Sequence, residues 1–463
     1  MNYICIVLMR LKLLGQREKS FNNKKFLIIV IALVATIVID ISVVRINDLI
    51  NKDFIPIQTR LILFSVNSSL CLLLQYFIIK QVRSSVRTDR LHGILRVRIF
   101  YFISLTSLCI MAALIGFMIF QQFSYSYFDT LLTMSIISIS YGTGAALMIL
   151  LSFLFFSWYK SNRSLIVLLY FISILFIAFH LIVTATYVNV KMNIRPSYTA
   201  QYVGTSGDVS GGQFLFLNDI YRISSFLSYI CIWTTTVALL NSYREKLANA
   251  IIYWIIFCLP HVYFLITFFY QFIFSNILIS YLEIDPVAVS IALGAFLSLS
   301  KPIGGVFFAF AFWKISTTIR YEKNIKTYMI IAGCGIFLIF SADQGEAQIT
   351  GPYPPFGVAS LTVLNTAAFL MLIGIYNSAV LVSTNDDLRK SIYKHALESK
   401  LLGAIGRAEV ESELQQTVRK ITDEKKHLIT ETQQPVELDG MELKKYIELV
   451  VREVKKDNIQ QTV

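Results

Sequence analysis

Long apolar runs, separated by short polar segments, constrain what this chain can fold into. Such runs recur from residue 26 to residue 383, and many reach the roughly 20 residues that a helix needs to cross about 30 Å of hydrocarbon. Hydrophobic residues make up 56% of the sequence, against roughly 45–50% in soluble domains. Lipid cannot bond to exposed backbone groups, so such runs must be helical. The sequence predicts an all-α, polytopic transmembrane bundle.

We predict about ten spans, with ends uncertain by a few residues. The ninth run is short and could instead be partly re-entrant. The predicted spans occupy residues 26–44, 61–79, 99–120, 131–157, 165–188, 222–241, 249–274, 287–313, 327–341 and 356–383. Residues 1–25 form a basic segment that we expect to lie against anionic headgroups and not to be a signal peptide. Residues 26–383 form the transmembrane domain, and residues 384–463 a polar tail.

Loops rich in lysine and arginine alternate along the chain with loops that are poor in them, and this pattern predicts the orientation of the spans. The loops at 121–130, 275–286 and 342–355 hold neither residue type, whereas the loops on the other side are basic. Loops rich in lysine and arginine stay in the cytoplasm. The alternation therefore predicts an even number of spans in the cell membrane, with both termini cytoplasmic.

The net charge of +12 does not predict a nucleic-acid partner. The basic residues lie in short loops between apolar runs, not on one face of a soluble domain. Membrane lipids are the partner that this placement predicts. The sequence also lacks a phosphate-binding loop, a dinucleotide-binding glycine pattern, a zinc-protease motif and a nucleophile elbow. We therefore expect no enzyme activity, no cofactor and no metal site.

Four ionisable residues deep within the predicted spans form a candidate intramembrane polar site. They are Asp40, His180, His261 and Lys301. A charged residue at the centre of a bilayer costs roughly 3 kcal/mol on insertion scales, so such residues often mark a binding site or a pathway. A structural role competes: a histidine can bond to a neighbouring helix, and a lysine can extend toward the interface.

Proline accompanies two of these residues and suggests interrupted helices. Pro260 precedes His261, and Pro302 follows Lys301, so the seventh and eighth spans are each expected to break near mid-depth. Transporters bind substrates at such broken helices, and ten spans would divide into two inverted halves of five. The second and third spans, which would be the counterparts, contain no proline. A simple kink remains the alternative.

The loop after the ninth span is a candidate outer ligand mouth. It carries two carboxylates, Asp343 and Glu346, followed by an aromatic and proline-rich turn that contains Tyr353. Exposed carboxylates there would face cations or polar ligands. The alternative is a solvated loop whose prolines open the tenth span, because proline is common at the first position of a helix.

The tail after residue 383 changes from apolar to mixed charge. Apolar residues recur at helical spacing with interruptions, which predicts an amphipathic helix or weak coiled coil. They are Leu388, Ile392, Leu401, Ile405, Ala408, Val418, Ile421 and Leu428. Such a face must be covered by a second copy of the chain, by the inner loops or by a cytosolic protein.

The junction of the last span and the tail resembles a family of uncharacterised archaeal multi-spanning membrane proteins. The similar stretches run from Asn377 to Glu409 and from Leu443 to Val454. This resemblance implies no activity and no site residues. From the residues themselves, our first hypothesis is a sensor or signal relay that couples an outer or intramembrane site to the tail. The alternative is a secondary transporter with a polar site at the seventh and eighth spans.

Overall fold

The computed structural model describes the membrane domain and the start of the tail. The described residues are 23–50, 56–86, 94–193, 212–241, 254–255, 257–266, 268–269, 299–318, 323–345, 353–385, 388–389, 392, 401–412 and 414–415. Within these ranges the chain is helical, and no β-strand occurs. The predicted all-α fold is confirmed. The predicted N-terminal segment 1–25 lies almost wholly outside the described residues, as does the tail after residue 415.

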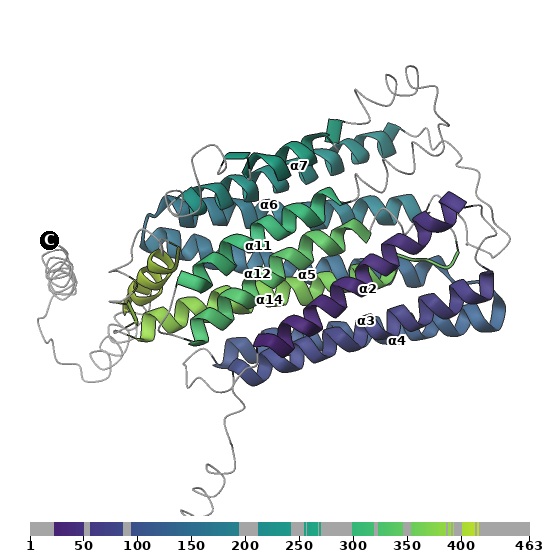
Figure 1. Cartoon of the computed structure of the whole chain (residues 1–463), viewed down its shortest axis with the longest axis horizontal. Helices are drawn as coiled ribbons and strands as arrows, with labels where there is room; N and C mark the ends of the chain where they lie inside the picture. Colours follow the sequence, from purple (N-terminus) through teal and green to yellow (C-terminus); the bar gives the residue numbers. More distant parts are fainter. Residues whose placement is uncertain are drawn as a thin grey trace, which may run out of the picture.

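Long helices dominate the structure (Figure 1). They are α2 (Asn23–Ile50), α3 (Ile57–Val86), α4 (Ile94–Tyr125), α5 (Thr130–Ser161), α6 (Leu165–Asn193), α7 (Gly212–Leu240), α11 (Ser300–Thr318), α12 (Lys323–Ala342) and α14 (Val358–Thr384). A 3-10 turn, η2 (Asp343–Gly345), follows α12. Most of the helices extend beyond the predicted spans because polar residues at helix ends can reach the membrane interface while the backbone stays helical.

Eight of the helices are long and apolar enough to cross a membrane. They match the predicted spans one to six, nine and ten, so the chain is a multi-pass integral membrane protein. The ninth span covers Lys323–Asp343 and is therefore not too short to cross. For the seventh predicted span the structure describes a shorter apolar helix, Phe257–Ile266. For the eighth it describes α11, and residues 270–298 lie outside the described ranges.

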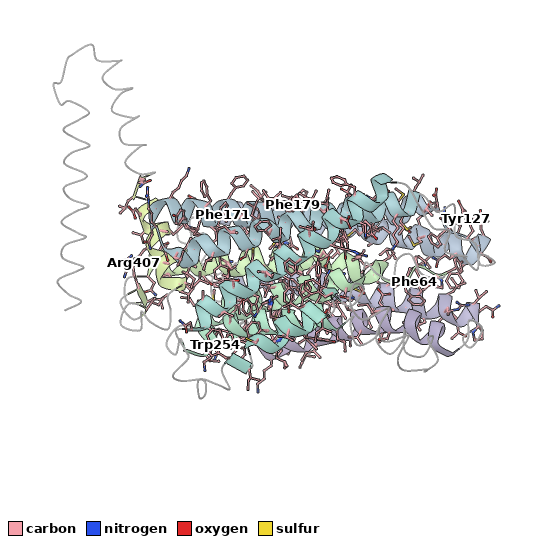
Figure 2. All side chains as sticks on the ribbon, turned by 90° about the horizontal axis from the view of Figure 1, so that it is seen from above. Phe64, Tyr127, Phe171, Phe179, Trp254 and Arg407 are labelled. Atoms are coloured by element: carbon pink, nitrogen blue, oxygen red, sulfur yellow. The ribbon has the colours of Figure 1, made fainter. Side chains whose placement is uncertain are left out.

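Helix α14 is the central element of the bundle. Each of its residues from Val358 to Ser383 is buried, although the helix has the composition of a membrane span. Helices α12 and α5 cover most of it, and α2, α3 and α4 complete its surroundings (Figure 1). The outer helices instead direct large apolar side chains away from the bundle, as Phe179 of α6 does in Figure 2. Lipid would cover those side chains, whereas protein covers α14.

Two glycines allow α12 and α14 to approach closely. A Cβ atom added to Gly335 of α12 would lie 2.5 Å from the backbone nitrogen of Met371. A Cβ atom added to Gly374 of α14 would lie 2.6 Å from the backbone nitrogen of Ala332. Each helix therefore uses a glycine where it meets the other helix's backbone. Small residues are typical of helix interfaces in membranes, where van der Waals packing replaces the hydrophobic effect as the main driving force.

Candidate functional site

Lys301 and Asp343 form an ion pair inside the bundle. The Nζ atom of Lys301 donates to Oδ2 of Asp343 at 2.6 Å, and the two side chains are 13% and 5% exposed. Breaking a buried pair by removing one partner typically costs about 3–5 kcal/mol because the other charge is left uncompensated. The two residues therefore depend on each other.

The backbone brings these two residues together at neighbouring helix ends. Helices α11 and α12 pack side by side, with Gly305 against Phe340 and Gly333 against Ala309, so they are antiparallel. Lys301 lies in the first turn of α11, and Asp343 directly follows α12. A helix N-terminus repels a cation and a C-terminus repels an anion. Each charge is thus disfavoured by its own helix end and favoured by the neighbouring one.

His180 of α6 joins the ion pair. Its Nε2 lies 3.3 Å from Oδ2 of Asp343, and its Nδ1 lies 3.0 Å from Oγ of Ser224 on α7. The hydroxyl of Thr184 lies 3.4 Å from the same Nδ1. His180 is buried near the centre of α6. Its ring is held by partners from two other elements, the η2 turn and α7. We call Lys301, Asp343 and His180 the ion cluster.

Two tyrosines border the ion cluster. The hydroxyl of Tyr141 on α5 donates to Oδ1 of Asp343 at 3.4 Å, which gives that carboxylate a donor on each oxygen. The ring of Tyr221 on α7 lies 5.9 Å from Nζ of Lys301 and stacks on Tyr187 at 4.7 Å. An ammonium near an aromatic face gains a further electrostatic stabilisation. Four helices and the η2 turn therefore surround the charges.

The predicted polar site divides into separate environments. Lys301 and His180 belong to the ion cluster, but His261 stacks on Trp233 at 4.4 Å between ring centroids. Asp40 binds the first turn of α14: its Oδ2 accepts hydrogen bonds from the backbone N–H of Ser360 at 2.9 Å and from its hydroxyl at 2.7 Å. The α14 N-cap residue, Gly357, has no side chain to supply such a bond. Asp40 therefore caps α14 from another helix.

The predicted outer mouth is also divided. Asp343 is buried in the ion cluster, and Glu346 lies outside the described residues. Tyr353 is buried and stacks on Phe128 at 5.9 Å, while its backbone carbonyl accepts a hydrogen bond from Arg60 at 3.4 Å. Burial raises the pKa of Tyr353 to about 12, so its hydroxyl stays protonated at neutral pH. The side chain of Tyr353 therefore packs the loop against the bundle and does not face outward.

The prolines do not interrupt the described helices. Pro302 lies in the first turn of α11, where the backbone N–H that proline lacks would have no helical partner in any case. Pro260 lies within the helix Phe257–Ile266, which continues through it. The carbonyl of Pro260 accepts a hydrogen bond from the hydroxyl of Tyr229 at 3.1 Å. Residues 270–298 lie outside the described ranges, so the break predicted in the eighth span near Pro302 stays a prediction.

The tail helix, defined as the described residues 401–412, packs against the far end of the bundle. The indole nitrogen of Trp158 on α5 donates to Oε2 of Glu409 at 2.6 Å, and the amide of Asn162 donates to the carbonyl of Ala404 at 3.3 Å. Gly406 lies against Val382 of α14. The apolar residues Leu401, Leu402, Ile405 and Ala408 are buried. Figure 2 shows Arg407 of the tail helix at the opposite end of the bundle from Tyr127.

Part of the predicted amphipathic face of the tail thus lies against the C-terminal ends of α5 and α14. The bundle itself therefore buries the apolar side chains of Leu401, Ile405 and Ala408. Residues after 415, which carry the rest of the predicted pattern, lie outside the described part of the chain.

Within the described ranges, no three histidine, cysteine or acidic side chains are grouped so that they could hold a metal ion. Comparisons of the chain with protein-family models, curated proteins and solved structures found no match. The resemblance to archaeal membrane proteins therefore stays a prediction, and function must be argued from the ion cluster and the tail.

Sequence reasoning named every member of the ion cluster but assigned Asp343 to a different place. Its position after a short apolar run suggested an outer loop, either a ligand mouth or a solvated loop. No signal in the sequence indicated this pairing, because Lys301 lies inside the predicted eighth span whereas Asp343 follows the ninth. Tyr141 and Ser224 were not predicted, because a tyrosine or serine in an apolar run gives no distinguishing signal.

Proposed function

We propose that this protein is a membrane sensor or signal relay, in which a change at the ion cluster alters how the tail helix binds the bundle. One observation supports it most directly: side chains of α5 form hydrogen bonds both to the ion cluster and to the tail helix. Tyr141 donates to Asp343, and Trp158 donates to Glu409 of the tail helix. Helix α5 rises about 1.5 Å per residue, so about 25 Å separates these two contacts along its axis.

The burial of the cluster supports the same proposal. A charged group in a low-dielectric interior interacts strongly with its neighbours, so a change of charge or partner there is felt through packed helices. Interfaces between packed elements also tend to have discrete arrangements, which amplify small local shifts. Trp158 and Asn162, which bond to the tail helix, both lie at the end of α5, so a shift of α5 would alter the docking of the tail helix.

The charges of the loops predict a protein in the cell membrane with both termini on the cytoplasmic side. In this orientation the relay would pass its signal to the cytosol. The tail beyond the docked helix would then bind a cytosolic protein or a second copy of the chain. Cross-linking and pull-down from native membranes, comparing the full chain with one ending at Ser383, tests this part. A partner recovered with both chains would contradict it.

The coupling itself is tested by hydrogen–deuterium exchange of residues 401–412 in protein reconstituted in nanodiscs. Asp343→Asn removes the charge that pairs with Lys301. Among the described contacts, Asp343 has none with the tail helix, so any effect there must be indirect. We expect faster exchange of the tail helix in this variant. Ser65→Ala is the matched control, because the hydroxyl of Ser65 bonds to Leu61 within α3. Equal exchange in both variants would contradict the relay.

A secondary transporter is the second candidate, and the ion cluster favours it. Ionisable residues inside a membrane bundle commonly lie on ion or substrate pathways. The residues concerned are Lys301, Asp343 and His180, in place of the predicted pair of Lys301 and His261. Uptake into proteoliposomes that is lost in Lys301→Met and retained in Lys160→Met would favour transport over relay.

A further inference from the structure

We propose that the ion cluster is a proton-binding site and that His180 is the residue that takes up and releases the proton. The proposal names the ligand of the proposed sensor, and only its consequence for the tail helix rests on that function. Protonation itself is argued from the hydrogen bonds around His180 and can be measured independently.

Three oxygens lie within hydrogen-bond distance of the His180 ring nitrogens, and each can accept a hydrogen bond. Nε2 faces the carboxylate of Asp343. Nδ1 faces the hydroxyls of Ser224 and Thr184. Each hydroxyl has one hydrogen and donates it to a backbone carbonyl at 2.8 Å: Ser224 to Tyr221, and Thr184 to His180 itself.

A neutral imidazole carries a hydrogen on one nitrogen only, whereas the imidazolium carries one on each. The observed arrangement therefore matches the imidazolium, with Nε2–H donating to Asp343 and Nδ1–H to the two hydroxyls. In the neutral ring Nδ1 carries a lone pair, so the Ser224 hydroxyl must leave the Tyr221 carbonyl in order to donate to Nδ1. The neutral state therefore loses a hydrogen bond that the protonated state keeps.

Charge favours the opposite state. Lys301 and Asp343 already neutralise each other, so protonation of His180 leaves the cluster with a net positive charge in a buried place. Burying an unbalanced charge is unfavourable. Hydrogen bonding thus favours the protonated ring and charge balance favours the neutral one. A site with two opposed preferences of this kind can exchange a proton.

The titratable groups around His180 and its partner Asp343 come from four elements. Asp343 follows α12, Lys301 lies on α11, Tyr221 on α7 and Tyr141 on α5. The ammonium at 2.6 Å from Asp343 keeps that carboxyl ionised, and the phenols of the tyrosines lose protons only at high pH. Histidine is the group whose charge changes near neutral pH. Among these residues His180 is therefore the site of exchange.

The proton step balances without another reactant. In the neutral state Nε2–H donates to Asp343, and the Ser224 hydroxyl turns from the Tyr221 carbonyl to donate to Nδ1. A hydronium ion then breaks one O–H bond and gives its proton to the Nδ1 lone pair, which forms an N–H bond; water leaves, and the Ser224 hydroxyl returns to the carbonyl. The charge of the cluster rises by one. Each exchange thus changes the bonding between α6 and α7.

The test uses solid-state NMR of the full chain, labelled with ¹⁵N-histidine and reconstituted in liposomes of phosphatidylcholine and phosphatidylglycerol. The chain has 5 histidines. His92, His261, His395 and His427 are changed to glutamine, which leaves His180 as the single reporter without altering the cluster. Spectra are recorded from about pH 5 to pH 8, the range in which histidine titrates.

We expect two protonated ring nitrogens at the acidic end and one at the basic end, with the ratio of the two forms changing at least tenfold. In the same background Asp343→Asn removes the carboxylate facing Nε2, and we expect the doubly protonated signal to be lost. An imidazole that keeps one protonation state throughout, or one whose titration is the same in Asp343→Asn, would overturn the proposal.

The failure of the relay is distinguishable from the failure of the proton site. Hydrogen exchange of residues 401–412 is measured over the same pH range in the same liposomes. If His180 titrates while the exchange stays constant, the proton site is supported and the relay is not. If His180 does not titrate, the proton site is overturned whatever the tail helix does.

Discussion

Nζ of Lys301 lies 2.6 Å from Oδ2 of Asp343, across the neighbouring ends of the antiparallel helices α11 and α12. Neither helix end favours the charge it carries, so each residue is stabilised chiefly by the other. The ion pair thus links the neighbouring ends of α11 and α12.

The first prediction concerns the loss of one charge. Lys301→Met leaves Asp343 buried and uncompensated, so we expect a loss of about 3–5 kcal/mol in stability. Lys160→Met is the control, because Lys160 is exposed and lies over Phe156 with 4.6 Å between its Nζ and the ring centroid. Thermal unfolding midpoints in detergent compare the two. The double variant Lys301→Met with Asp343→Leu should regain most of the stability, and a double variant as unstable as the single one would contradict the pairing.

The second prediction concerns the closest helix contact. Gly374→Ala places a methyl group within 2.6 Å of the Ala332 nitrogen and the Tyr328 carbonyl, so α12 and α14 must separate. Overpacking of this kind costs about 1–3 kcal/mol. Gly116→Ala is the matched control, because the added methyl meets no atom within 4 Å. Removing a helical glycine there should raise stability by up to ~1 kcal/mol. Unfolding midpoints that fall by equal amounts in both variants would show that the close contact does not matter.

The third prediction concerns Asp40 as the cap of α14. Asp40→Leu removes the acceptor for the Ser360 N–H and hydroxyl, and we expect destabilisation by about 1–3 kcal/mol, the cost of leaving a buried donor unpaired. Asp40→Asn keeps an acceptor oxygen and should lose much less. Their unfolding midpoints separate a capping role from a charge role. If Asn were as damaging as Leu, the negative charge rather than the cap would be what the site requires.

The fourth prediction concerns the docking of the tail helix. Trp158→Phe keeps an aromatic ring and removes the N–H that donates to Glu409. A hydrogen bond to a charged group contributes about 1.5–3 kcal/mol, so hydrogen exchange of residues 401–412 should become at least about tenfold faster. Glu409→Gln retains an acceptor and serves as the milder comparison. Protection that survives Trp158→Phe unchanged would place the docking energy in the apolar contacts of Leu401 and Ile405.

The ion cluster illustrates how far sequence reasoning extends to a site. Lys301 and His180 were identified because an ionisable group in an apolar run is costly wherever it faces, and that cost depends on the residue type alone. The partners were not identified in the same way. His261 lies in the preceding predicted span and was predicted to share a polar site with Lys301, but it stacks on Trp233. Which groups meet depends on the rotation of each helix about its axis and on where each helix ends.

The sequence by itself determined the helical class, the membrane location and eight of the spans, because each follows from local composition and from the need to satisfy backbone groups in lipid. It also determined that the start of the tail has a face to bury. The tertiary structure alone decided that α14 is the central helix, since its composition resembles that of lipid-facing spans such as α6. It likewise decided that Asp343 pairs with Lys301 and His180, because contacts between distant residues are set by packing between helices, which composition and periodicity do not encode.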